Sequence, residues 1–185
     1  LAYFGAKILH PASIWPAQMY NVPVKLLNTM QPEAKGTTIM AEAGSVGVKA
    51  VAAKDGIIAI KIKSSRMLLA YGFLRKIFEV FEKYRTPIDM ITTSEVAVSL
   101  TIDDTTYLED IKNELAAFGT VDIDEHQTII CVVGDFGAEK HGYAARVLEA
   151  LKHIPIRMIS YGGSDHNLSL LLKTSDKIEA LRSLH

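Results

Sequence analysis

Residues 67–103 read MLLAYGFLRKIFEVFEKYRTPIDMITTSEVAVSLTID. Apolar residues recur over 73–81 at steps of three and four, with charged residues between them, which predicts an amphipathic helix that begins after Gly72. After Pro87 the pattern changes to the alternation of a half-buried strand, clearest over 96–102. The stretch therefore predicts a loop, a helix and two strands joined by a tight turn.

A weaker copy of this pattern follows about seventy residues later, so the chain contains an internal repeat. Each copy has a glycine at the predicted helix start, then a proline, then two strand segments. The aligned pairs are Gly72 and Gly142, Phe78 and Leu148, Glu79 and Glu149, Phe81 and Leu151, Pro87 and Pro155, Met90 and Met158, Ile91 and Ile159, Ser99 and Ser169, and Leu100 and Leu170. One module is predicted to occur twice.

The composition is that of a globular chain with few charge-based partners. Its 185 residues are 49% hydrophobic, which is ample for packed cores. The net charge of -1, without a cluster of Lys and Arg, argues against nucleic acid or a membrane as a partner. The single cysteine, Cys131, excludes an internal disulfide, and its apolar neighbours predict a buried thiol. No apolar run approaches the ~20 residues of a membrane span and no signal peptide pattern is present, so we expect a cytoplasmic protein.

Residues 1–40 differ in character from the rest, with prolines at positions 11, 16, 23 and 32. We expect a short helix before Pro11, a second helix that begins near Ser13, and a strand over 22–27. These elements could not bury a core alone, so they are predicted to be the end of a larger α/β unit. The chain begins without Met, and we expect a fragment of a longer protein.

The first module is predicted over residues 57–125, in the order strand, helix, strand, strand, helix, strand. Its second helix is expected over about residues 106–118 and its last strand over 120–125. This βαββαβ order is that of a ferredoxin-like sandwich, a four-stranded antiparallel sheet with two helices on one face. A turn signal at residues 54–56 is expected to precede the module.

The second module, over residues 127–185, lacks a fourth strand, which would leave an open edge in its sheet. Residues 46–53 form a predicted strand with no assigned place. We therefore expect 46–53 to pair with the second module, which then consists of 46–53 plus 127–185 with the first module inserted in it. The fold class is α+β, with two ferredoxin-like βαββαβ modules after a short α/β remnant.

Three segments resemble the aspartokinase family, and the resemblance extends over nearly all of the chain. They are FGAKILHP at residues 4–11, IDMITTSEVAVSLTID at 88–103 and RMISYGGSDHNLSLLL at 157–172. The first resembles the end of the family's catalytic domain, the second its lysine-sensitive branch, and the third its second ACT module. The resemblance implies a tandem ACT regulatory region, preceded by the tail of the amino-acid kinase domain at residues 1–40.

The resemblance also implies what the parent protein does. Aspartokinases phosphorylate the side-chain carboxylate of L-aspartate with ATP and Mg²⁺, and their ACT modules bind an end-product amino acid and transmit inhibition to the kinase. We expect no kinase activity and no cofactor in this fragment, a homodimer through the ACT modules, and the chain's own kinase domain as a further partner. Lys7 matches a lysine near the nucleotide in the family and is a candidate ATP contact, with a solvent-facing lysine as the alternative.

The residues themselves suit a free amino acid, which carries a carboxylate and at least one ammonium. Backbone N–H groups at the helix start after Gly72 can bind the carboxylate, because the first turn has unpaired donors. Asp89 and Glu95 can bind ammonium groups through charge-assisted hydrogen bonds. Two carboxylates on one short segment favour L-lysine, with its two ammonium groups, over threonine.

The resemblance places the effector site at eight positions of this sequence. These are Met67, Gly72, Phe73, Leu74, Ile88, Asp89, Ser94 and Glu95. Ala70 stands where lysine-sensitive relatives often carry serine, so a threonine-responsive region stays an alternative.

Ordinary structural roles remain open for most of these positions. They are a loop glycine at Gly72, core side chains at Met67 and Phe73, and solvated charges at Asp89 and Glu95. In that case the chain is a ligand-free ACT dimerisation module.

The second module differs at one informative position. Arg157 aligns with Asp89, and this reversal of charge argues against an equal lysine site there. The six histidines show no metal-ligand spacing, so no metal site is expected.

Overall fold

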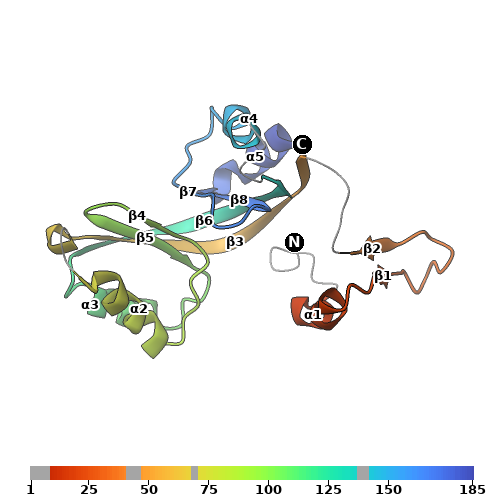
Figure 1. The fold of residues 1–185 in the computed structure, drawn as a ribbon. Coiled ribbons are helices and arrows are strands. Elements are labelled where there is room, and N and C mark those ends of the chain that lie inside the picture. Colours follow the sequence, from red (N-terminus) through yellow and green to blue (C-terminus); the bar gives the residue numbers. More distant parts are fainter. Residues whose placement is uncertain (1–8, 41–46, 68–70, 137–141) are drawn as a thin grey trace.

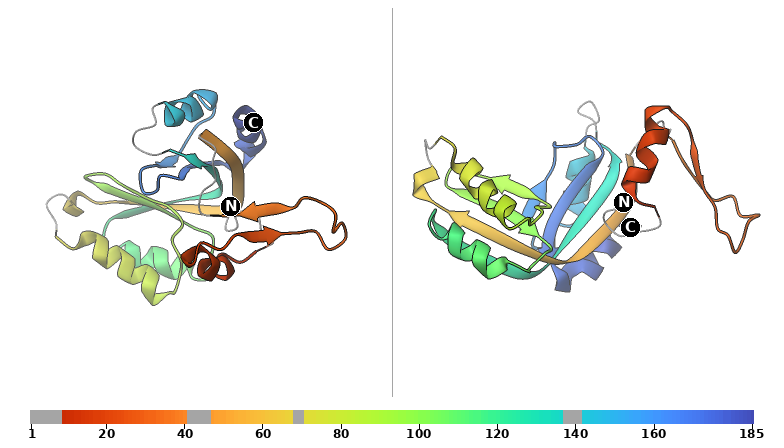
Figure 2. Two further views of the ribbon diagram at one scale, coloured as in Figure 1. Left: turned by 45° about the vertical axis from the view of Figure 1, so that its right-hand side comes forward. Right: turned by 90° about the horizontal axis from the view of Figure 1, so that it is seen from below.

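The computed structural model describes residues 9–40, 47–67, 71–136 and 142–185 (Figure 1). The first of these ranges forms a small unit that lies beside a six-stranded sheet (Figures 1 and 2). Its elements are α1 (Pro11–Met19), β1 (Val24–Leu26) and β2 (Thr37–Ile39). β1 and β2 pair antiparallel.

Helix α1 begins two residues before the predicted Ser13. Pro11 is its first residue, and His10 is its N-cap, because His10 Nδ1 accepts a hydrogen bond from the Ala12 backbone N–H at 3.2 Å. Proline suits the first helical position, where its missing N–H would have no intrahelical partner. The predicted helix near Ser13 is therefore confirmed, with His10 and not Ser13 as its cap. The helix predicted before Pro11 falls largely on residues 1–8, outside the described residues.

A six-stranded antiparallel sheet, in the order β4-β5-β3-β6-β8-β7, forms the body of the molecule. Its strands are β3 (Gly47–Lys63), β4 (Ile91–Thr93), β5 (Ala97–Ile102), β6 (Thr120–Asp135), β7 (Met158–Ser160) and β8 (Asn167–Lys173). The central strands β3 and β6 have 17 and 16 residues, far more than the others. Instead of forming two separate sheets, the predicted modules share these two strands.

Both central strands continue where the sequence predicted breaks. The predicted turn at residues 54–56 is wrong, because β3 pairs with β6 on both sides of it. Gly56 and His126 have φ angles of 74° and 55°, in the left-handed region, and the register of the pair shifts around them. These are bulges, which absorb an extra residue and bend a strand without ending it. Residues that are typical of turns therefore bend two continuous strands here.

The first part of β3 pairs with the second part of β6. Val51 lies opposite Val132, and Ala53 lies opposite Ile130. This confirms the predicted pairing of residues 46–53 with the second repeat, for the described residues from Gly47 onward.

The sheet divides into two similar halves along β3 and β6. We define the first half as β4, β5, the helices α2 (Phe73–Lys83) and α3 (Leu108–Leu115), the second part of β3 and the first part of β6. The second half contains β7, β8, the helices α4 (Tyr143–Ala150) and α5 (Lys177–Leu184), and the remaining parts of β3 and β6. The two helix pairs lie toward opposite ends of the long strands (Figure 1).

Each half has its own apolar core between its helices and the sheet. Ile60, Ile77 and Leu100 are fully buried in the first core, and Ile130 and Leu170 in the second. The predicted amphipathic helix over 73–81 is confirmed, because its apolar stripe packs into the first core.

A third cluster joins the two halves. Ile58 faces the first core, whereas its neighbour Ile57 points to the other face of β3, as alternation along a strand requires. On that face Ile57 packs in one cluster with Met90, Ile129, Met158 and Leu171. Met90 and Met158 are an aligned pair of the repeat, so the two copies meet at equivalent residues.

The repeat predicted from the sequence is confirmed in the backbone. Gly72 and Gly142 are the N-caps of α2 and α4, with φ angles of 77° and 87°. Ile91 pairs with Leu100 in the first half, and the aligned Ile159 pairs with Leu170 in the second.

Candidate functional site

The predicted effector region begins at the loop before α2. Met67 ends a short 3-10 turn and packs against the first core. Gly72 caps α2 without a side-chain hydrogen bond to the first-turn amides. Residues 68–70, which include Ala70, lie outside the described residues. The helix start therefore presents backbone donors at the position where the sequence predicts carboxylate binding.

Two of the candidate residues on α2 have different surroundings. Phe73 is buried in the first core and meets Phe118 edge to face, with ring centroids 6.3 Å apart. Leu74, the next residue, is exposed. Phe73 therefore positions the helix start, whereas Leu74 can contact a ligand.

Ser94 and Glu95 form the turn between β4 and β5, at the same end of the sheet as the start of α2. The Ser94 backbone N–H donates to the Ala97 carbonyl at 2.8 Å, and the Ser94 hydroxyl contacts the same carbonyl at 3.4 Å. The Ser64 N–H donates to the Val96 carbonyl at 2.9 Å, which ties this turn to the end of β3. Glu95 is exposed on the turn.

Asp89 lies at the opposite end of this hairpin. Its backbone N–H donates to the Thr101 carbonyl at 2.9 Å, and the preceding Ile88 packs against the first core. Five residue steps separate Asp89 from Ser94, with β4 between them, so these two positions are about 16 Å apart along the chain. Within one chain, Met67, Gly72, Ser94 and Glu95 therefore lie toward the turn end of the β4–β5 hairpin. Asp89 lies at its opposite end.

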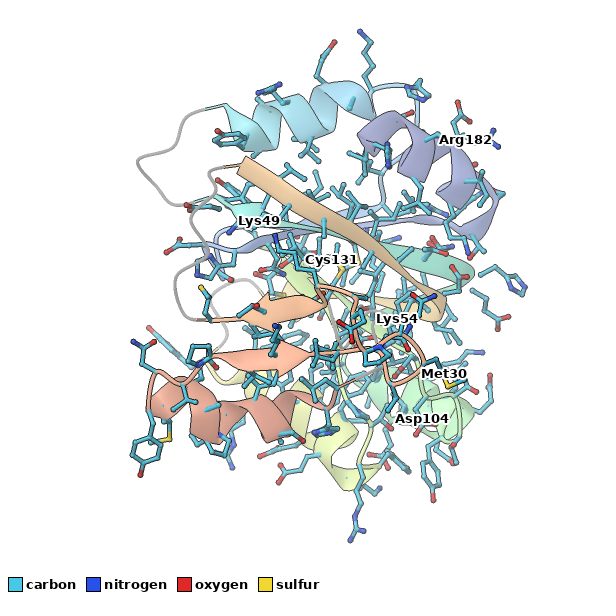
Figure 3. All side chains as sticks on the ribbon, turned by 90° about the vertical axis from the view of Figure 1, so that its right-hand side faces the viewer. Met30, Lys49, Lys54, Asp104, Cys131 and Arg182 are labelled. Carbon is cyan, nitrogen blue, oxygen red and sulfur yellow. The ribbon has the colours of Figure 1, made fainter. Side chains whose placement is uncertain are left out.

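The Asp89 carboxylate is buried and already binds an ammonium. Its side chain is 2% exposed, and its two oxygens accept hydrogen bonds from Lys54 Nζ at 3.1 and 3.2 Å. The same Nζ lies 2.8 Å from Asp103 Oδ2. Lys54 projects from β3 (Figure 3). We call these three residues the acidic cluster, since two carboxylates share one ammonium.

The acidic cluster contains two residues that the sequence reasoning missed. Lys54 was assigned to a turn between two strands, which would have placed it away from the sheet face. In the structure the bulge at Gly56 keeps Lys54 within β3. Asp103 directly follows β5. An acidic residue at each outer end of a hairpin is a weak sequence signal, and the partner on β3 emerges only with the strand pairing.

A similar ion pair with reversed charges lies at the bulge of β6. Arg157, aligned with Asp89, lies 3.4 Å from Asp124 Oδ2. Asp124 follows Lys54 by seventy residues and occupies the corresponding position before the bulge of β6. Both side chains of this pair are about half exposed, at 41% and 52%.

A polar cluster at the bulge of β3 also joins this strand to β6 and α5. Asp55 accepts hydrogen bonds from Lys177 Nζ at 2.5 Å and from the Thr128 hydroxyl at 2.8 Å. These two donors hold the pKa of the Asp55 carboxyl below its ordinary value. The cluster stabilises the charged form of Asp55 next to Lys54.

The remaining site predictions fall outside what the structure describes or concern absences. Lys7 lies outside the described residues. Within the described ranges no group of three or more His, Cys, Asp or Glu side chains could hold a metal ion. None of the helices in those ranges is long and apolar enough to cross a membrane.

Comparison with known proteins gives consistent relatives. A family model described as an ACT domain matches residues 130–185. Aspartokinase 3, chloroplastic, of Arabidopsis thaliana is 35% identical over the whole chain, and lysine-sensitive aspartokinase 3 of Escherichia coli is 32% identical over the whole chain. The chain covers 35% and 43% of these two proteins, so it spans about two fifths of the curated relatives it matches.

Solved structures agree with these relatives. A C-terminal regulatory domain of aspartate kinase from Porphyromonas gingivalis is 53% identical, with a TM-score of 0.67 over 73% of this chain and 93% of that chain. Escherichia coli aspartokinase III in complex with lysine and aspartate is 32% identical, with a TM-score of 0.87 over 100% of this chain and 43% of that chain. The chain belongs to the aspartokinase family and is an ACT regulatory region of that family.

Proposed function

We propose that the chain binds L-lysine and transmits feedback inhibition to a parent aspartate kinase. The observation that carries the proposal is the Asp89 carboxylate, which holds a lysine-type ammonium with both of its oxygens. A residue that binds the ammonium of Lys54 has the charge and the geometry to bind that of a free lysine. The Escherichia coli relative, described as lysine-sensitive, supports the choice of effector.

The geometry favours a site shared between two copies. Within one chain, Gly72 caps α2 at the turn end of the β4–β5 hairpin and Asp89 lies at the other end of that hairpin, too far away for both to hold one small amino acid. β4 is an edge strand of the sheet, so a second copy can pair along it. In a twofold arrangement the acidic end of one chain faces the loop end of the other. We therefore propose a homodimer through the first half, with lysine bound at its interface.

The small N-terminal unit is the proposed link to the kinase domain. Large apolar side chains are exposed on it, which is typical of a surface that packs against another domain. They are Trp15, Met19, Tyr20, Val22, Leu27, Met30 and Met40. Lysine binding would favour one arrangement of the two halves, and this unit would pass the preference to the kinase domain.

The division of the chain follows from this role. We propose residues 1–40 as the end of the kinase domain, 57–125 as the first ACT module, and 46–53 plus 127–185 as the second. ATP with Mg²⁺ stays our proposal for the parent enzyme, with Lys7 as a nucleotide contact. No step of the phosphoryl transfer is assigned to the described residues.

A ligand-free dimerisation module is the second candidate, because Lys54 already neutralises Asp89. Isothermal titration of the chain with L-lysine, threonine and methionine separates the two. We expect heat from lysine that Asp89→Asn abolishes and Asp122→Asn, at an exposed ion pair with Lys63, leaves unchanged. Silence with all three amino acids, while sedimentation still shows a dimer, would support the second candidate.

A further inference from the structure

The acidic cluster has one more carboxylate than it has ammonium groups. Lys54 Nζ lies within 3.2 Å of both Asp89 oxygens and 2.8 Å from Asp103. Asp89 is 2% exposed, Lys54 17% and Asp103 38%. The buried carboxylate therefore shares its ammonium with a carboxylate that reaches solvent.

Because of these exposures, the loss of an ionic partner costs the three groups different amounts of free energy. The loss of a bound cation from a buried carboxylate is unfavourable, because the interior does not replace the lost solvation. Asp103, with solvent access, can keep a cation or lose it at small cost. Lys54 has a flexible four-carbon stem and can reach either carboxylate from one backbone position.

We infer that Lys54 is an internal competitor for the effector's ammonium at Asp89, and that Asp103 keeps Lys54 when the effector takes its place. The inference rests on the proposed function and adds the residues that set affinity and specificity. Asp89 exchanges one ammonium for another and is never left unpaired. Lys54 stays paired with Asp103 throughout, so neither charge is stranded.

The exchange also gives a reason for lysine as the effector. The path to Asp89 already accommodates an ammonium at the end of a four-carbon chain, that of Lys54. The side chain of free lysine reproduces this group, whereas threonine and methionine side chains carry no cation. Lys54 lies before the bulge on β3 and Asp89 at the start of the β4–β5 hairpin, so the exchange also releases a contact between β3 and that hairpin.

Titration of L-lysine into single variants tests the exchange. We expect Lys54→Met to bind lysine about tenfold more tightly, because the competitor is gone, and Asp103→Asn to bind about tenfold more weakly, because Lys54 then stays on Asp89. Lys63→Met and Asp122→Asn are matched controls, since they remove an exposed ion pair of 2.6 Å between β3 and β6, at the other end of β3 from Gly47. The controls should keep the wild-type affinity.

A second measurement does not depend on lysine as the effector. Lys54→Ala leaves room for an external cation, so n-butylammonium chloride should raise its melting temperature more than sodium chloride at equal ionic strength. The wild-type chain should show no such difference. This readout also serves if Lys54→Met does not fold.

The outcomes separate the two proposals. Lysine binding to the wild type with equal or weaker binding to Lys54→Met overturns the exchange and leaves the proposed function standing. Absence of lysine binding to every variant, together with rescue of Lys54→Ala by n-butylammonium, overturns the proposed effector and supports Asp89 as an ammonium site. Absence of both effects overturns both.

Discussion

The two halves of the molecule share a backbone and differ in the charges placed on it. Lys54, Asp89 and Asp103 correspond, at a spacing of about seventy residues, to Asp124, Arg157 and Lys173. Every charge in the set is reversed. Asp89 is nearly fully buried, whereas Arg157 is largely solvated. A duplicated fold has thus kept its strand pairing and changed its chemistry, so of these aligned positions it is Asp89 that presents a buried carboxylate to an ammonium.

The cores of the two halves also differ. In the first half Phe73 and Phe118 close the space between the helices and the sheet. In the second half the corresponding space holds an open cavity of about 380 Å³. Val48, Val132, Tyr143, Arg146, Val147, Ala150, Ser183 and Leu184 line it. Around the start of the repeated helix, the first half is therefore expected to be packed more tightly than the second.

Core truncation at aligned positions should give the largest contrast. Ile77→Ala removes a fully buried side chain and should cost about 3–4 kcal/mol of unfolding free energy. Val147→Ala, seventy residues later, should cost about 1–2 kcal/mol, because it removes less and borders an existing cavity. Urea unfolding followed by circular dichroism measures both. Equal losses would contradict the looser packing of the second core, because Ile77→Ala removes the larger side chain.

Removal of the aligned charges should give a smaller contrast. Asp89→Asn should cost about 2 kcal/mol, because Lys54 loses the charge of its buried partner. Arg157→Gln breaks a solvated contact and should cost less than about 0.5 kcal/mol. The same unfolding assay, with Lys63→Met as an exposed-pair control, checks both. A larger loss from Arg157→Gln would reverse our ranking of the two ion pairs.

The bulges of β3 and β6 should give the smallest contrast, and it depends on pH. The pKa of Asp55 is lowered in the folded state by Lys177 and Thr128, so its charge stabilises the fold above the unfolded pKa of about 3.9. This stabilisation is lost as the pH falls through the folded pKa. Asp55→Asn should therefore cost about 0.5–1 kcal/mol at neutral pH, and the difference should shrink below about pH 4 and disappear in stronger acid.

Glu125 is the control for that measurement, because it lies seventy residues after Asp55 at the corresponding bulge. Glu125→Gln should change the unfolding free energy little at either pH, since no ion pair of Glu125 is present among the described residues. Thermal melts from pH 3 to pH 7 compare the two variants. A cost for Asp55→Asn that stays constant with pH would show that its hydrogen bonds, and not its charge, stabilise the bulge.

Much of this architecture was predictable because local patterns carry it. The period of α2, the alternation along β5 and the glycines before both repeated helices each reflect one segment's own burial or backbone geometry. The aligned pairs of the repeat then placed Met90 and Met158 in equivalent positions. The break expected at residues 54–56 failed because the same residues suit a turn and a bulge, and only the neighbouring strand distinguishes them.

By itself the sequence determined the helices, most of the strands, the repeat, and the polar and charged residues at the two ends of the β4–β5 hairpin. These features follow from side chains a few residues apart. The tertiary structure alone decided that β3 and β6 each run through both halves, that Lys54 meets Asp89 across 35 positions, and that Asp89 and Ser94 lie at opposite ends of β4. Strand register and ion pairing depend on groups that are distant in the chain. Their positions become fixed only when both cores are packed.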